Sequence, residues 1–395
     1  MLPKQFVRSA ALVLLPVLIA CGTAEPRTAT QTTSVPTAAA TAASTPVPAR
    51  VTATAALSSA TAQPTPTPEI GSEAWYRQVV LSPTLRLEGE HPDALSVALD
   101  GQMAYVLRSL APAPYPAPEA GAQLCALDLS RPDTPQERGC VAASGASGLT
   151  YAAPLLWLAT AEGIQALDVS DPRSITTRTT FATTNAATLV RINGGRAFIT
   201  TTAPSKSSQG ELLIVDISDL DNLRLLGRYE AASPEVTGVE VAGDRAYLIN
   251  SFTGMDVLDI GDPAAPRLLG SYQTDQARGI ALEGELVYLA TGRGLEIVDV
   301  ADPAAPRLLG SSPTPFSAID VQLEGERLYL SYANIGSSDS GGMEVLDVGD
   351  PRRPALLAQA LLPAANTGAV QVSDGLIALP SSRHGLLLLR EVPAN

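Results

Sequence analysis

The sequence predicts an all-β fold, a seven-bladed β-propeller with four-stranded blades, preceded by a disordered N-terminal tether. The first observation is a recurring phrase, clearest at residues 254–270 and 294–310. In it an aliphatic segment ends in Asp, and an Asp-Pro turn leads to Arg-Leu-Leu-Gly. The second is its spacing of roughly 40 to 50 residues, the size of one propeller blade. The third is that short aliphatic segments alternate with Gly, Asp and Pro turns, without a sustained helical period.

Each unit contains four strand-like segments, which are clearest between residues 236 and 272. Residues 236–241 lead to a turn at Gly243-Asp244, and residues 245–250 and 255–260 follow as the second and third segments. Residues 267–272 form the fourth segment, after the Asp-Pro turn. Nearly continuous hydrophobicity is typical of strands buried on both faces of a sheet. Each unit therefore predicts one blade.

Two series of marker residues count the blades. An aspartate ends the third segment of six units, at Asp128, Asp168, Asp216, Asp259, Asp299 and Asp347. An aromatic residue lies in the second segment, at Tyr105, Trp157, Phe198, Tyr247, Tyr288 and Tyr329. We expect these rings to pack between neighbouring sheets. A shorter seventh unit follows, with segments at 368–372, 375–379 and 385–391.

The seventh unit lacks a fourth segment, and a candidate lies before the first unit. Residues 84–89 (Thr-Leu-Arg-Leu-Glu-Gly) are similar to the Arg-Leu-Leu-Gly phrase at 307–310. Pairing of residues 84–89 with 385–391 would close the ring through the N-terminus and leave no exposed sheet edge. The alternative is a six-bladed ring with a capping hairpin.

The N-terminus predicts export and a lipid anchor. Lys4 and Arg8 precede an apolar run at residues 10–20 that is too short to span a bilayer, as in a secretory signal. The run ends Leu18-Ile19-Ala20-Cys21, which resembles the lipobox of bacterial lipoproteins. The resemblance implies that residues 1–20 are removed and that Cys21 is lipidated. We therefore expect an extracytoplasmic protein anchored to a bacterial membrane, in the cell envelope. An ordinary signal peptide is the alternative.

Residues 21–72 are predicted to form the tether, and residues 73–395 the propeller. Thr, Ala, Pro and Ser dominate the tether, which cannot bury enough apolar surface to offset its ordering entropy. The net charge of −14 excludes a nucleic-acid partner that depends on clustered Lys and Arg. We expect a monomer.

Two further cysteines, Cys125 and Cys140, fall in consecutive strand-like segments of the first unit. The turn between these segments brings the two residues near each other, and an exported chain permits a disulfide. The alternative is a pair of free, small, apolar residues.

The repeated phrase resembles a known family. Leu213-Ile214-Val215-Asp216 and Glu296-Ile297-Val298-Asp299, each followed by a Ser/Ala-Asp step, are similar to the LVIVD-repeat family of bacterial surface propellers. The resemblance covers residues 75–392 and is loose in the first and seventh units. In the seventh, Arg390 replaces the Asp and no Asp-Pro turn follows. It implies a β-propeller and says little about activity.

Candidate site residues come from the segments expected to line the central channel. The residue type varies from unit to unit at the position three residues before the hairpin Gly. This position holds Arg191, Glu240 and Gln322 in three of the units, and Asp320 lies two residues before Gln322. Two interpretations remain open, a polar network satisfied within the protein and a ligand site. The recurrent Asp residues are interpreted as turn formers rather than Ca²⁺ ligands.

No catalytic motif, metal site or cofactor is predicted. His91 and His384 are the only histidines, and no Cys or carboxylate motif accompanies them. Three longer connections, at residues 110–121, 201–210 and 332–341, interrupt the same strand pair and would emerge on one face. We therefore expect a non-enzymatic binding or scaffolding module for an envelope protein or polysaccharide. The alternative is a propeller enzyme, a metal-assisted hydrolase or lactonase, with a polar site at the channel.

Overall fold

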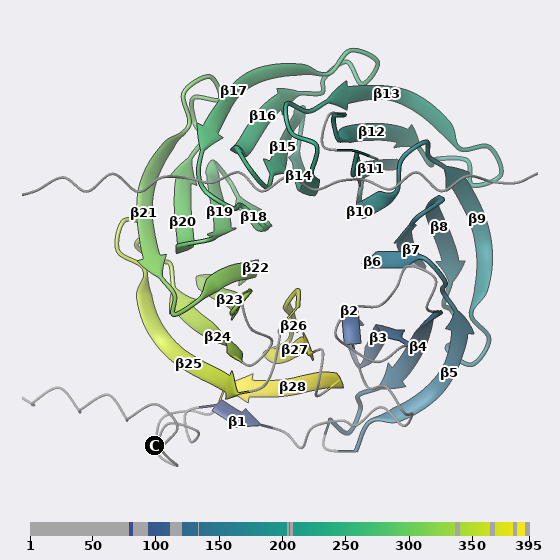
Figure 1. The fold of residues 1–395 in the computed structure, drawn as a ribbon. Helices are drawn as coiled ribbons and strands as arrows, with labels where there is room; N and C mark the ends of the chain where they lie inside the picture. The colour runs from purple at the N-terminus through teal and green to yellow at the C-terminus, as the bar shows by residue number, and fades with distance from the viewer. Residues whose placement is uncertain are drawn as a thin grey trace, which may run out of the picture. The chain divides into compact units, whose positions relative to one another are not determined.

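A computed structural model describes residues 79–81, 94–110, 121–132, 134–203, 205, 208–335, 340–363, 368–381 and 385–391. These residues lie within one compact unit, Pro66–Asn395, and form seven four-stranded antiparallel sheets arranged in a ring (Figure 1). The prediction of an all-β, seven-bladed propeller is confirmed. The six-bladed alternative is wrong, because the last three strands form a full sheet of their own with β1.

The strands take equivalent places in every blade. Innermost are β2 (Ala94–Asp100), β6 (Ala146–Ala152), β10 (Ala187–Asn193), β14 (Val236–Ala242), β18 (Gly279–Glu283), β22 (Ser317–Glu324) and β26 (Gln371–Ser373). Second are β3 (Met103–Ser109), β7 (Leu155–Thr160), β11 (Arg196–Thr201), β15 (Arg245–Asn250), β19 (Leu286–Thr291), β23 (Arg327–Ala333) and β27 (Leu376–Ser381).

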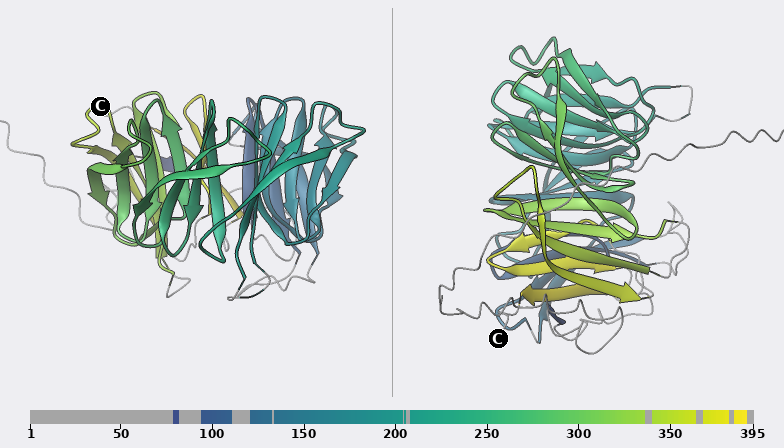
Figure 2. Two further views of the ribbon diagram at one scale, coloured as in Figure 1. Left: turned by 90° about the horizontal axis from the view of Figure 1, so that it is seen from above. Right: turned by 90° about the vertical axis from the view of Figure 1, so that its left-hand side faces the viewer.

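Third are β4 (Ala122–Asp128), β8 (Gly163–Asp168), β12 (Glu211–Asp216), β16 (Gly254–Asp259), β20 (Gly294–Asp299), β24 (Ser340–Asp347) and β28 (Gly385–Glu391). Outermost are β5 (Gln136–Ala142), β9 (Thr176–Ala182), β13 (Arg224–Glu230), β17 (Arg267–Gln273), β21 (Arg307–Pro313) and β25 (Ala355–Pro363). Blade 1 is β2–β5, blade 6 is β22–β25, and blade 7 contains β26, β27 and β28. Seen edge-on, the strands run between the two faces of the ring (Figure 2).

The N-terminal side of the chain supplies a strand beside β28. This strand is β1 (Val79–Leu81), which pairs antiparallel with β28 so that Val79 lies opposite Glu391 and Leu81 opposite Leu389. Residues 84–89, the predicted closing segment, lie outside the described residues. Closure of the ring by the N-terminal segment stays a prediction.

The core lies between the blades, as the marker aromatics predict. Tyr105, Trp157 and Phe198, with their equivalents Tyr247, Tyr288 and Tyr329, are each at most 2% exposed. Each ring stands directly opposite the variable inner-strand position; Phe198 faces Arg191 and Tyr247 faces Glu240 across their strand pairs. The expectation that these rings pack between sheets is confirmed, so they offer no exposed stacking platform.

A second contact joins four of the blades to their successors, between a glycine of the outermost strand and the next blade's turn, which contains a proline. A Cβ placed on Gly310 of β21 would lie 2.1 Å from the carbonyl oxygen of Pro351. The same approach links Gly227 to Pro263 and Gly270 to Pro303, at 2.0 and 2.4 Å. The two halves of the repeated phrase therefore meet in space, across a blade boundary.

The exceptions follow the same rule. Ala358 takes the glycine's register in blade 6, whose successor has no Asp-Pro turn. Thr179 takes it in blade 2, whose successor has Asp219-Leu220 in place of Asp-Pro. Glycine is therefore present where a proline turn presses against the strand, and larger residues are present where none does.

Candidate binding site at the channel mouth

The seven innermost strands surround the centre of the ring, and side chains link several of them to the next. Thr150 donates its hydroxyl to the carbonyl of Val190 at 2.7 Å, and Thr188 donates to that of Val236 at 3.0 Å. Asn193 continues the series by donating to Val241 at 3.1 Å. These bonds join backbone that the ladders of single sheets leave unpaired.

Arg191 and Glu240, two predicted channel residues, form an ion pair across a blade boundary. The guanidinium Nε of Arg191 lies 2.8 Å from Glu240 Oε1, and another guanidinium nitrogen lies 3.3 Å from the Thr150 hydroxyl. The side chains are 30% and 27% exposed, respectively. Three neighbouring blades are thereby connected.

Asp320 and Gln322, the other two predicted residues, bind the backbone of blade 7. The Gln322 amide oxygen accepts the N–H of Val372 at 2.9 Å. The Asp320 carboxylate accepts the N–H groups of Val321 and Val370. Ser331 adds a third link, because its hydroxyl donates to the carbonyl of Gly368 at 2.9 Å. Blade 7 has a short inner strand, and these blade 6 side chains satisfy the adjoining backbone.

A cavity of ≈ 280 Å³ lies at one end of the channel. All seven blades contribute to its wall, and its polar lining includes Ser96, Arg191, Glu235, Thr237, Ser251, Arg278, Asp320 and Gln371. Ser251 belongs to the connection between β15 and β16, and Glu235 immediately precedes β14. The cavity therefore opens at the end of the ring where second strands pass into third strands.

The three longer connections begin at this same end. Their bases are closed by backbone hydrogen bonds, Leu110 N to Gly121 O at 2.9 Å and Asn334 N to Ser340 O at 2.9 Å among them. Because every blade has the same strand order, connections between second and third strands all emerge on one face. The cavity and the bases of the long connections thus share a face.

Three charged groups of the cavity, Glu235, Arg278 and Asp320, have no ion pair among the described residues. Burial raises the pKa of the Asp320 carboxyl to about 7, partly opposed by the Arg191 guanidinium and by the backbone N–H donors. The Nε of Arg278 is buried and has no hydrogen-bond partner in the described part of the chain, while another of its nitrogens donates to Gln276 Oε1 at 3.1 Å. Arg278 was not anticipated from sequence, because it falls one residue before β18 and outside the variable position.

The recurrent aspartates of the third strands act on turns. Asp259 and Asp299 each accept the backbone N–H two residues later, at 2.9 and 3.0 Å, and an arginine binds the other oxygen. These backbone and arginine hydrogen bonds lower the pKa of both carboxyls. The turn-forming interpretation is confirmed for these residues, and it leaves their oxygens occupied within the protein.

A further repeated position lies in the third strands, three residues before the turn aspartate. This position was not singled out from the sequence. In blade 1 it holds Cys125, directly opposite Cys140, and the two form a disulfide with a Cα–Cα distance of 4.1 Å. In blades 4, 5 and 6 it holds the buried acids Asp256, Glu296 and Glu344. The signal was available in the spacing, because each acid precedes the marker Asp by the same interval.

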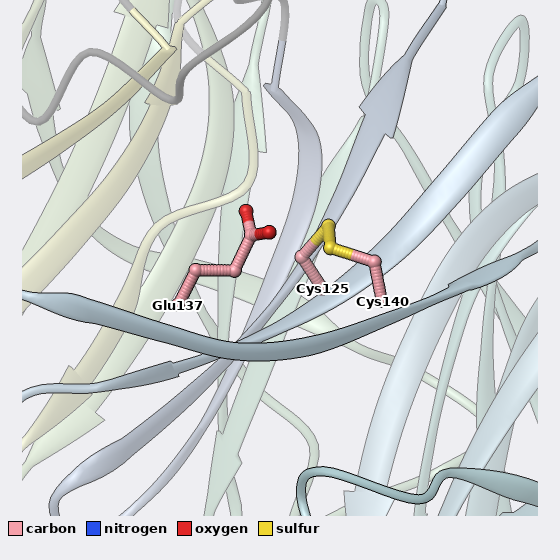
Figure 3. A group of neighbouring side chains, drawn as sticks. All are labelled: Cys125, Glu137 and Cys140. Carbon is pink, nitrogen blue, oxygen red and sulfur yellow. A yellow bond between two sulfur atoms is a disulfide. The ribbon is translucent and has the colours of Figure 1, made fainter.

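Cys125 and Cys140 also lie near Glu137, within the reach of one metal ion (Figure 3). Their sulfurs are bonded to each other, so neither offers the thiolate that binds metals. Arg108 lies 3.4 Å from the Glu137 carboxylate. The geometry therefore fits a disulfide with a neighbouring ion pair and does not fit a metal centre.

Reduction of this disulfide is expected to lower the free energy of unfolding by about 3 kcal/mol, because a loop of this length gains that entropy in the unfolded chain. Urea unfolding with and without a phosphine reductant measures the change. The variant Cys125→Ala/Cys140→Ser is the control and should not respond to reductant. An equal response in both proteins would contradict the prediction.

Glu344 predicts a pH-dependent stability. It is 3% exposed, and burial raises the pKa of its carboxyl to about 7, although Gln359 donates to it at 2.7 Å. Because the unfolded carboxyl titrates near 4.5, the protein loses stability as pH rises from about 4.5 to 7. Glu344→Gln, which copies Gln165 of blade 2, should remove this loss and gain roughly 2 kcal/mol at pH 8.

Urea unfolding at pH 4 and pH 8 tests the Glu344 prediction. The exposed Glu326 supplies the control variant Glu326→Gln, which should follow the wild type at both values. A Glu344→Gln variant with the same pH dependence as the wild type would show that the buried carboxyl carries no penalty.

The fold and the channel define a seven-bladed β-propeller. Within it, residues 207–231, 235–274 and 276–314 match the family described as LVIVD repeat. These matches cover the last two strands of blade 3 and the whole of blades 4 and 5. No curated protein sequence matches the chain.

Solved structures agree on the fold. A computationally designed protein, Ika8, is 12% identical with a TM-score of 0.52, over 78% of this chain and 98% of that one. A chain of the mitotic checkpoint complex is 11% identical with a TM-score of 0.57, over 80% of this chain and 95% of that one. At these identities the likeness concerns the fold alone.

Among the described residues, no helix has the length and hydropathy needed to cross a bilayer. His91 and His384 lie outside the described residues.

Proposed function

We propose that this protein is a lipid-anchored, extracytoplasmic binding module of the bacterial cell envelope. Cys21 carries the anchor, residues 21–72 form the tether, and the propeller binds an envelope protein or polysaccharide as a monomer. The observation that carries the binding role is the coincidence of the channel cavity with the bases of the three long connections on one face. Insertions concentrated on one face of a repeat fold often mark its binding face.

The polar channel supports binding over hydrolysis. Arg191, Glu240 and Gln322 are each engaged by a partner within the protein. Among the described residues, no three histidine or carboxylate ligands converge at the channel. The Cys125–Cys140 disulfide supports an oxidising compartment, since disulfides are rare in the reducing cytosol.

Membrane attachment is tested with the full-length chain expressed in a bacterial host. Wild-type protein should partition into the detergent phase and incorporate labelled palmitate, and Cys21→Ser should do neither. Soluble, unlabelled wild-type protein would refute the anchor.

The binding face is tested with the full-length chain in detergent, offered to a panel of envelope polysaccharides and, by crosslinking, to purified envelope proteins. Shortening the connections at 110–121, 201–210 and 332–341 should abolish capture. The matched control changes the opposite face at two exposed turn alanines, Ala265→Ser and Ala305→Ser, and should retain capture. Hydrolysis of a lactone or ester by the wild-type protein, without capture of any partner, would reject the binding module.

A further inference from the structure

The cavity at the channel mouth has a wall with balanced charges. Arg191 and Arg278 are positive, and Glu235 and Asp320 are negative. Arg191 is already paired with Glu240, at 2.8 Å. One guanidinium and two carboxylates therefore remain for a ligand, and they belong to blades 4, 5 and 6.

Arg278 is positioned to bind an acceptor. Gln276, whose backbone has a φ of 54°, holds one guanidinium nitrogen at 3.1 Å, and the buried Nε has no acceptor in the described part of the chain. A buried donor without an acceptor is costly, more so when it is charged. A ligand carboxylate that draws the guanidinium toward the cavity would supply acceptors for two of its N–H groups.

Asp320 also lines the cavity, and it would be stabilised by a cation, whereas Arg278 would be stabilised by an anion. Its carboxylate packs against the backbone of Gly279, where an added Cβ would lie 2.7 Å from Oδ1. No ion pair joins Asp320 to Arg278 among the described residues, although Asp320 lies on β22 and Arg278 immediately precedes the neighbouring inner strand, β18. A cationic ligand group beside Asp320 would offset the desolvation of its charged form.

We propose that this cavity binds a small zwitterion of the α-amino acid class, with its carboxylate at Arg278 and its ammonium group at Asp320 and Glu235. The volume of ≈ 280 Å³ lies just below the range of about 300–1,000 Å³ that holds drug-sized ligands, so the ligand is small. Ser96, Thr237, Ser251 and Gln371 supply neutral donors and acceptors around it. The inference deepens the proposed binding function by naming a ligand class for one part of the face.

The charged groups around Asp320 also predict a pH dependence of binding. Arg191 and the N–H groups of Val321 and Val370 favour its ionised form, whereas burial and Glu240 oppose it. An ammonium group requires that form, so affinity should increase as pH rises from 6 to 8.

The experiment is calorimetric titration of the full-length chain in detergent with glycine, alanine, glutamate and lysine. Each is compared with its N-acetylated and its amidated derivative, and with glucose. At least one free amino acid should bind, and blocking either end should weaken binding at least ten-fold, because hydrogen bonds to charged groups are strong. Arg278→Gln should weaken binding of the free amino acid ten-fold and leave the amidated derivative unchanged. Asp320→Asn should remove the pH dependence.

Two further variants keep the result interpretable. Arg353→Gln, at an exposed arginine on the opposite face, should bind as the wild type does. Glu235→Gln tests the ammonium end if Asp320→Asn does not fold, and should also weaken the free amino acid. Three outcomes would each overturn the proposal: acetylated derivatives that bind as tightly as the free amino acids, binding of glucose alone, or no binding at 10 mM ligand. The last limit is chosen because a dissociation constant of roughly 1 mM is already weak for a built site. Capture of macromolecules by the loops is measured separately, so either function can fail while the other stands.

Discussion

Replacing Gly310 with alanine is expected to destabilise the protein by about 3 kcal/mol, the upper end of the typical cost of overpacking, because the contact is with backbone. The added Cβ would lie 2.1 Å from the carbonyl oxygen of Pro351, and its next two neighbours are backbone atoms of Arg352. No side chain can rotate away, so blades 5 and 6 must separate. Urea unfolding measures the loss.

Two controls separate this contact from a general effect of alanine in place of glycine. Gly261→Ala should be nearly neutral, because Ala301 takes the same place in the next blade and the nearest atoms belong to side chains. Ala358→Gly, at the register of Gly310, should cost only about 1 kcal/mol, the backbone entropy of glycine. A Gly310→Ala variant as stable as Gly261→Ala would show that the glycine–proline contact does not constrain the ring.

Removal of the N-terminal strand is expected to lower the melting temperature by roughly 10 °C. The three backbone pairs that are lost contribute about 3 kcal/mol, and each kcal/mol shifts the melting temperature of a large domain by about 2–4 °C. β1 pairs with β28 at Val79, Val80 and Leu81, and without it β28 becomes an unpaired edge. Melting is compared for chains lacking residues 1–72, 1–81 and 1–93.

The three truncations place the closing strand. A drop between the first and second assigns closure to β1, and a drop only between the second and third assigns it to residues 84–89. Deletion of 1–72 is the control and should leave melting unchanged, because it removes only the predicted signal and tether. Equal stability of all three chains would reject closure through the N-terminus.

Much of this fold could be predicted because its information is local and repeated. The spacing of marker residues such as Asp259 and Tyr247 gave the strand register, and the structure places them opposite Arg245 and Glu240. The strand beside β28 was harder to place, since a short outer strand has no marker Asp and no Asp-Pro turn. Its described residues, Val79–Leu81, precede the predicted segment.

The candidate site was predicted in its position and not in its contacts. Sequence placed Arg191, Glu240, Asp320 and Gln322 on inner strands, but pairing depends on side-chain reach across blade boundaries. Arg191 meets Glu240, whereas Gln322 meets the backbone of Val372. Arg278 was missed because the residue that enters the cavity comes from the irregular segment before β18. Such departures from the repeat carry no periodic signal.

The fit between Gly310 and Pro351 has a consequence for exchanging modules between propellers of this kind. The glycine and the turn that it contacts belong to successive blades. A transplanted blade therefore brings the glycine of one contact and the turn of another, and both face residues of the host propeller that did not evolve with them. A segment that carries both the glycine and its matching turn starts at an outermost strand, such as β21, and ends after the turn that follows the third strand of the next blade, β24. Chimeras cut at those points should assemble where chimeras cut between blades fail.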